Sequence, residues 1–244
     1  KAISIKPDYA DAYNSLGSSL QEIGKLEEAI EAYEKALAIK PDVAQVYNNI
    51  GLAFQNLNKF EEAEGALRKA LAVDPNYALA LNNLGIALQS QNKINEAIGA
   101  YQKALSIKPD YAEAYTNIAI ALKDLIFIKP NPSLQKTIIS LLERGSYCRP
   151  KDLTSAAISL LKFEPNLKKH LGKVRVNGPI QNLLMVISEL SDLPLMLKLM
   201  SVCPLPDIEL ETLFKQLRAS ILESLPYLTE ASHELLRFQS ALAL

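Results

Sequence analysis

The first half of the chain repeats one pattern of apolar and polar positions, and its spacing predicts pairs of α-helices. Each unit opens with a segment whose apolar residues follow i, i+3, i+4 and i+7 spacing, which places them on one helix face. A second segment follows, in which small residues let the two helices approach closely. The first segments carry Tyr13, Leu16, Gly17 and Leu20, then Tyr47, Ile50, Gly51 and Phe54, then Leu81, Leu84, Gly85 and Leu88. The second segments carry Ala29, Tyr33 and Ala36, then Ala63, Leu67 and Ala70, then Ala97, Tyr101 and Ala104.

A fixed period of 34 residues orders these segments. Prolines fall at Pro7, Pro41, Pro75 and Pro109, in the contexts KPDYADAYNSLG, KPDVAQVYNNIG, DPNYALALNNLG and KPDYAEAYTNIA. Each proline stops a second helix and turns the chain. The polar residues that follow the prolines are expected to cap the first helices: Asp8, Asp42, Asn76 and Asp110. Gly24, Asn58 and Asn92 should end those helices, because all three tolerate the left-handed conformation. A period of this length indicates stacked supersecondary units.

These features resemble the tetratricopeptide repeat (TPR). Gly or Ala recurs at the close-packing position of the first helix, at Gly17, Gly51, Gly85 and Ala119, and a proline closes each unit. The family's usual Trp is Tyr or Leu here, and its turn Gly is Asn in two units. The resemblance implies an all-α fold, a TPR α-solenoid of about three full repeats with partial ones, over residues 1–126. We place the repeats near 10–43, 44–77 and 78–111, with a partial repeat at 112–126. Residues 1–6 align with the end of a second helix, so we expect the chain to be a fragment of a longer protein.

The second half, residues 127–244, lacks the period and is expected to form an irregular helical domain. The connector FIKPNP, residues 127–132, carries two prolines that block a continuous helix. Helix-like stretches follow at about 133–144, 152–163, 166–171, 179–190, 193–202, 207–225 and 230–243. In the sixth, one face holds Leu210, Leu213, Phe214, Leu217, Ile221 and Leu225. Pro206 and Asp207 should start that helix, and residues 173–176 alternate as a short strand would. The helix at 133–144 could pair with 112–125, and the rest could cover the open end of the array.

The stretch LLERGSYCRPKDLTSAAISLLKFEPNL, with KLMSVCPLPDIELE later, resembles the region that precedes a class I S-adenosylmethionine-dependent methyltransferase domain in bacterial TPR-methyltransferase fusions. The resemblance implies that a catalytic domain would begin beyond Leu244. Because no glycine-rich loop follows a strand in this chain, no cofactor site can be assigned, and we expect no cofactor.

The helical period also predicts a binding surface on the first helices. At 100° per residue, Asn49 and Leu52 point away from the core side of their helix. Two rows result, Ser15–Asn49–Asn83–Asn117 and Ser18–Leu52–Ile86–Ile120, flanked by Asn48, Asn82, Gln55 and Gln89. The candidate peptide-binding residues are therefore Asn48, Asn49, Leu52, Gln55, Asn82, Asn83, Ile86, Gln89, Asn117 and Ile120.

An Asn amide both donates and accepts, so the polar row could hold an extended backbone while the aliphatic row takes side chains. The row resembles the asparagine ladder in the repeats of the O-linked N-acetylglucosamine transferase. Two alternatives stay open at this stage. The asparagines could instead bond neighbouring helices, and the aliphatic row could be covered by the C-terminal helices or by another subunit.

Composition narrows the function classes. The chain has 49% hydrophobic residues and a net charge of −1, which does not favour nucleic-acid binding. No apolar run is long enough to span a membrane. Cys148 and Cys203 fit free thiols in a reducing compartment, hence a cytoplasmic protein. His170 and His233 lack a second ligand at metal spacing, and the basic group Lys162, Lys168, Lys169, Lys173 and Arg175 is interrupted by Glu164.

We therefore expect a scaffold that binds a protein or an extended peptide and is not itself an enzyme, with no metal, nucleic-acid or membrane partner. The second interpretation is the substrate-recruiting portion of a methyltransferase or other modifying enzyme. The third is a self-assembly module that forms a homo-oligomer through the ends of the array.

Overall fold

The computed structural model describes residues 10–123, 125–171, 183–202 and 207–224, and all regular secondary structure within these ranges is helical. The chain divides into two compact units, Lys1–Ala121 and Leu122–Leu244, close to the division after residue 126 that the end of the repeat predicts. None of the helices in the described ranges combines the length and apolar character of a transmembrane span.

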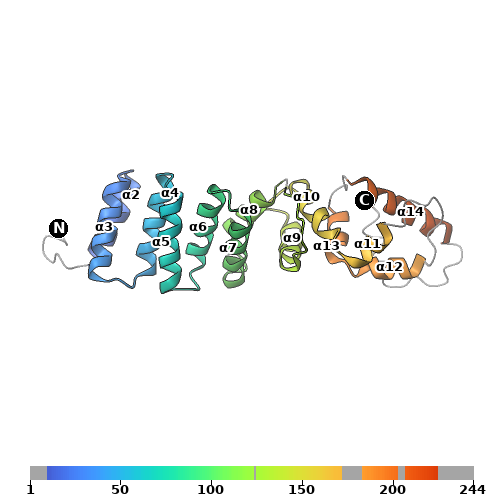
Figure 1. Cartoon of the computed structure of the whole chain (residues 1–244), viewed down its shortest axis with the longest axis horizontal. Helices are drawn as coiled ribbons and strands as arrows, with labels where there is room; N and C mark the ends of the chain where they lie inside the picture. The colour runs from blue at the N-terminus through green and yellow to red at the C-terminus, as the bar shows by residue number, and fades with distance from the viewer. Residues whose placement is uncertain (1–9, 124, 172–182, 203–206, 225–244) are drawn as a thin grey trace. The chain divides into compact units, whose positions relative to one another are not determined.

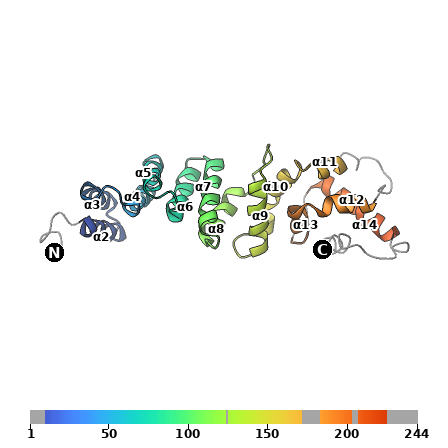
Figure 2. The same cartoon turned by 90° about the horizontal axis from the view of Figure 1, so that it is seen from below.

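The first unit is an array of antiparallel helix pairs, as the period predicts (Figure 1). The first helix of each pair is α2, α4, α6 or α8, and the second is α3, α5 or α7. Their bounds are α2 Ala10–Glu22, α3 Leu26–Ile39, α4 Ala44–Asn56, α5 Phe60–Val73, α6 Ala78–Ser90, α7 Ile94–Ile107 and α8 Ala112–Leu122. Within this unit the first helices lie along one side and the second helices along the other (Figure 2).

The turns between paired helices form as the sequence predicts, but the caps differ. Gly24, Asn58 and Asn92 have positive φ angles of 79°, 57° and 61° and reverse the chain after each first helix. The prediction that Asp42 and Asn76 cap the first helices is wrong. The caps of α4 and α6 are Val43 and Tyr77, and neither side chain makes a capping bond. Asp42 and Asn76 stay in the turn after their prolines, so α4 and α6 begin later than the capping rule suggests. Asp8 lies outside the described residues.

Close packing within each pair depends on the predicted small residues. A Cβ added at Gly17 would lie 2.5 Å from Cε1 of Tyr33, and one at Gly51 would lie 2.6 Å from Cγ of Leu67. Gly85 meets Tyr101 in the same way. The second helices contribute small residues that are fully buried: Ala29, Ala63, Ala70, Ala97 and Ala104. A side chain of Tyr or Leu thus fills the space that each glycine leaves, which confirms the close-packing role of these positions.

The second unit is helical throughout its described residues. Its helices are α9 Pro132–Arg144, α10 Pro150–Leu161, α11 Pro165–Leu171, α12 Leu183–Ser191, α13 Pro194–Met200 and α14 Ile208–Ser224. Four of them begin at a proline, where a missing N–H is harmless. These helices confirm the first six predicted stretches. The predicted strand at 173–176, the predicted helix at 230–243, Pro206 and Leu225 lie outside the described residues.

The core of this unit forms where α13 packs on α9 and α10 and where α14 packs on α11 and α12. The predicted apolar face of α14 is buried at Leu210, Leu213, Phe214, Leu217 and Ile221. Asp207 starts that helix as predicted, because its Oδ1 accepts a hydrogen bond from the Leu210 amide at 3.0 Å.

Candidate functional site

Direct side-chain hydrogen bonds hold the first helices of successive repeats side by side. Three asparagine pairs make them, each joining residues 35 positions apart. Nδ2 of each downstream asparagine donates to Oδ1 of the upstream one: Asn49 to Asn14 at 3.3 Å, Asn83 to Asn48 at 2.9 Å, and Asn117 to Asn82 at 2.9 Å. The asparagine rows are therefore interhelical linkers along α2, α4, α6 and α8, which is the alternative that the sequence left open.

Burial removes part of the predicted site from the surface. Asn48 is 1% exposed, and Asn82 and Asn83 are each 4% exposed. Their positions face the neighbouring first helix, so a ligand could reach them only by opening the array. We narrow the candidate site to residues that stay at the surface.

The two glutamines are also occupied within the array. Gln89 Oε1 accepts a hydrogen bond from the Tyr101 hydroxyl at 3.0 Å, as Gln21 does from Tyr33 at 3.1 Å. In the middle repeat Leu67 replaces the tyrosine and offers no hydroxyl. Gln55 Nε2 donates instead to the backbone oxygen of Asn83 in the next repeat, at 2.7 Å. Both glutamines are half-buried, and their side chains bond within the array.

What remains is a surface that we call the first-helix face. It is made of the exposed or half-buried residues at four equivalent positions of α2, α4, α6 and α8: Asp11, Ser15, Ser18, Glu22, Gln45, Asn49, Leu52, Asn56, Leu79, Ile86, Ser90, Glu113, Asn117 and Ile120. Within it, Leu52 and Ile86 are half-buried and Ile120 is 58% exposed. The outward orientation predicted for Asn49 and Leu52 on α4 recurs at Ile86 on α6 and at Asn117 and Ile120 on α8. The exception is Asn83 on α6, which is buried.

Sequence reasoning missed Leu79, which is 41% exposed on this face. The signal was available, since Leu79 lies 34 residues after Gln45, a position that points outward on α4. Leu79 adds an apolar side chain near the start of α6.

The charge on the first-helix face is low and of one sign. Helices α4 and α6 contain no charged residue, α2 contains Asp11 and Glu22, and α8 contains Glu113. Lys and Arg are absent from these four helices. Among the described residues of this unit, the lysines lie in the turns and on the second helices, for example Lys59 and Lys69.

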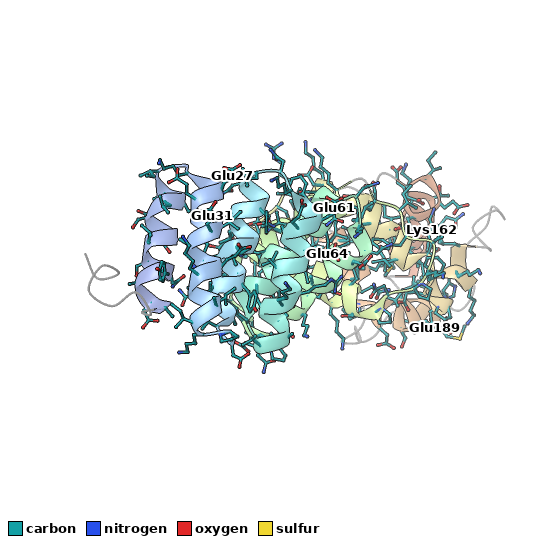
Figure 3. The ribbon with its side chains drawn as sticks, turned by 60° about the vertical axis from the view of Figure 1, so that its left-hand side comes forward. Glu27, Glu31, Glu61, Glu64, Lys162 and Glu189 are labelled. Carbon is teal, nitrogen blue, oxygen red and sulfur yellow. The ribbon has the colours of Figure 1, made fainter. Side chains whose placement is uncertain are left out.

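Charged groups elsewhere serve the fold. Figure 3 shows Glu64 on α5, where its carboxylate accepts hydrogen bonds from Lys93 at 2.9 Å and Gln91 at 3.0 Å and pairs with Arg68 at 2.8 Å. The hydrogen bond from Lys93 is the main cause that lowers the pKa of Glu64 to about 2. This network joins α5 of the second repeat to the turn between α6 and α7 of the third repeat.

Two lysines of the basic group in the second unit are likewise paired. Lys162 lies 2.6 Å from Asp207, and Lys169 lies 2.7 Å from Glu189; Lys162 and Glu189 are labelled in Figure 3. His170 is buried, with its Nε2 2.7 Å from the Glu189 carboxylate. Lys173 and Arg175 lie outside the described residues, as do His233 and Cys203. Burial raises the pKa of the Cys148 thiol, which makes it a poor nucleophile at neutral pH.

Family comparisons match the array. Tetratricopeptide repeat models match residues 42–110 and residues 1–31, and a TPR repeat model matches residues 18–58. These matches end at residue 110, so the resemblance of the second half to a methyltransferase fusion stays a prediction. No curated protein matches the chain.

Several solved structures are similar to the array. A MamA crystal structure is 31% identical, over 49% of this chain and 70% of that one, with a TM-score of 0.47. The first TPR of Spaghetti (RPAP3), bound to the HSP90 peptide SRMEEVD, is 28% identical over 46% of this chain and 89% of that one, with a TM-score of 0.45. The second TPR domain of human RPAP3, in complex with the HSP70 peptide SGPTIEEVD, is 29% identical over 47% and 96%, with a TM-score of 0.46.

Proposed function

Because residues 1–110 are tetratricopeptide repeats, we propose that the array is a protein-binding scaffold that holds an extended segment of its partner against the first-helix face. The observation that carries the proposal is the apolar row Leu52, Ile86 and Ile120, which is accessible on a surface with almost no charge. A contiguous apolar strip of this kind on a folded protein usually has a partner.

The amide groups beside the row suit a peptide backbone. Asn49 and Asn117 each use one N–H to bond the preceding first helix. A primary amide has a second N–H and two acceptor lone pairs, and both residues are half-buried rather than covered. Each can therefore hydrogen-bond a peptide unit of the bound segment without breaking the array.

The charge of the first-helix face indicates that acidic peptides should not bind to it. An acidic peptide such as SRMEEVD, which the RPAP3 domain holds in its structure, would meet no Lys or Arg on α2, α4, α6 or α8. We expect it not to bind, and it serves as a control.

The test is selection from a random twelve-residue peptide library on the 244-residue chain, with the binders then measured on two variants. Ile86→Ser with Ile120→Ser removes two side chains of the row. Val73→Ser with Ile107→Ser is the matched control, because both residues are exposed apolar side chains on second helices.

We expect selected peptides to bind the wild type and the control variant equally and to bind the Ile86/Ile120 variant about tenfold or more weakly, as the loss of two apolar contacts implies. Circular dichroism should be unchanged in both variants. Peptides that bind all three proteins equally would show that the first-helix face is not the binding surface.

A further inference from the structure

The spacing of the apolar row restricts the conformation of whatever lies along it. Side-chain bonds join α4 to α6 through Asn48 and Asn83 and α6 to α8 through Asn82 and Asn117. Helices in direct side-chain contact have axes about 8–10 Å apart. Leu52, Ile86 and Ile120 occupy equivalent positions on these three helices. A segment that crosses the helices along the row therefore meets one aliphatic side chain about every 8–10 Å.

Few backbone conformations return a side chain to the same side at that distance. A β-strand does so every second residue, after about 6.6 Å. A polyproline II helix has three residues per turn and a rise of 3.1 Å, so every third side chain recurs after about 9.3 Å. The polyproline II repeat therefore matches the spacing of the row. The two-residue repeat of a strand is shorter, so its side chains would no longer lie opposite the row after two contacts.

An α-helix also offers a comparable distance, since seven residues span about 10.5 Å. The amides on the face argue against it. Asn49 and Asn117 lie beside the row with hydrogen-bonding capacity left, but the backbone groups of an α-helix are already paired with one another. A polyproline II segment has no internal hydrogen bonds, so its carbonyl and N–H groups are free to meet those amides.

The charges define the rest of the chemistry. Asp11, Glu22 and Glu113 are the charged residues of the four first helices. An acidic side chain on the segment would find no Lys or Arg on α4, α6 or α8, and over α8 it would share the helix with Glu113. A neutral or basic segment meets no such penalty.

We infer that the first-helix face takes a polyproline II segment that carries an apolar side chain at every third position and no acidic residue. This inference rests on the proposed function, because it specifies the partner of the same surface. It predicts the sequence pattern of the binding segment, which the proposed function alone does not.

Three fluorescein-labelled peptides of twelve residues test the inference by fluorescence anisotropy on the 244-residue chain. The first is four repeats of Leu-Pro-Gln. The second contains the same residues, rearranged so that leucine recurs at every second position. The third is four repeats of Leu-Pro-Glu, which keeps the register and adds negative charge.

We expect the first peptide to bind about tenfold more tightly than either of the others. The second peptide lacks the three-residue register of leucines, and the third carries acidic residues. The Ile86→Ser, Ile120→Ser variant should weaken its binding about tenfold, and the Val73→Ser, Ile107→Ser control should leave its affinity within about twofold.

Each other outcome overturns the inference. Equal affinity for the first and second peptides would refute the three-residue register, and equal affinity for the first and third would refute the exclusion of acidic residues.

Failure of the first peptide to bind, while library selection yields peptides that depend on Ile86 and Ile120, refutes the inference and leaves the proposed function standing. Absence of any peptide that depends on this face refutes both. Sedimentation that shows self-association lost in the Ile86/Ile120 variant would identify a second copy of the chain as the occupant and would also refute it.

Discussion

Nδ2 of Asn83 donates a hydrogen bond to Oδ1 of Asn48 at 2.9 Å, between two side chains that are almost fully buried. The bond joins α6 to α4 and has counterparts on either side, from Asn49 to Asn14 and from Asn117 to Asn82. The array is therefore held together by the same residue type that also borders its exposed face. The buried asparagines Asn48, Asn82 and Asn83 only link helices, whereas the half-buried Asn49 and Asn117 link helices and also border the face.

Replacing Asn83 by Ala should destabilise the array. Oδ1 of Asn48 would lose its donor inside the protein, and an unsatisfied buried acceptor costs about 1–3 kcal/mol. Urea denaturation followed by circular dichroism measures the loss. The matched control is Asn49→Ala, whose bond is longer at 3.3 Å and half-exposed, and which should cost less than about 0.5 kcal/mol. Equal losses for the two variants would contradict the structural role of the buried bond.

Alanine substitutions at two helical glycines should change the stability of the protein in opposite directions. In Gly51→Ala the new Cβ would lie 2.6 Å from Cγ of Leu67, against a fully buried side chain, so overpacking should lower the free energy of unfolding by about 1–3 kcal/mol. In Gly99→Ala no atom lies within 4 Å of the new Cβ, and the change should stabilise α7 by about 0.5–1 kcal/mol. Thermal unfolding of both variants decides the point. A stabilised Gly51→Ala protein would show that the two helices are not in close contact there.

The Glu64 network predicts a pH dependence of stability. The pKa of Glu64 is lowered from 4.5 to about 2, mainly by its hydrogen bond with Lys93. A carboxyl with a lowered pKa in the folded state stabilises the protein above its unfolded pKa and loses that contribution as the pH falls. The difference in free energy of unfolding between wild type and Glu64→Gln should be constant above about pH 5 and should shrink between about pH 4.5 and pH 2.

Denaturant titrations at several pH values measure that difference. Its size at neutral pH should be about 1 kcal/mol or less, because Lys93 and Arg68 are partly exposed. Glu61→Gln, on the same helix (Figure 3), corrects for the removal of one negative charge. A Glu64→Gln difference that stays unchanged from pH 7 to pH 2 would mean that the network does not stabilise the folded state.

The cap of α14 can be tested in the second unit. Asp207→Ala removes the acceptor of the Leu210 amide and the partner of Lys162, and loss of a cap costs about 0.5–2 kcal/mol. Amide hydrogen exchange in α14 should become faster. Asp207→Ser keeps a capping oxygen without the charge and should restore most of the protection. If the serine variant exchanges as fast as the alanine variant, the ion pair with Lys162 is the important contact.

The sequence by itself determined the helices of the array and their order. The 34-residue period, the small residues at Gly17, Gly51 and Gly85, and the turn residues Asn58 and Asn92 are local signals that act within one unit. Because helix formation and close packing of a pair depend on residues near one another in the chain, these predictions agree with the structure. The caps at Asp42 and Asn76 were predicted wrongly because the turn after each proline takes up those residues.

The tertiary structure alone decided which asparagines remain at the surface. Asn48 and Asn49 are adjacent in the chain, yet one is buried and the other half-exposed, because successive residues of a helix point about 100° apart. The sequence gives each side chain a direction around its own helix. Only the position of the neighbouring helix, 35 residues away in the chain for each bonded pair, decides which of those directions is covered and which stays open to a partner.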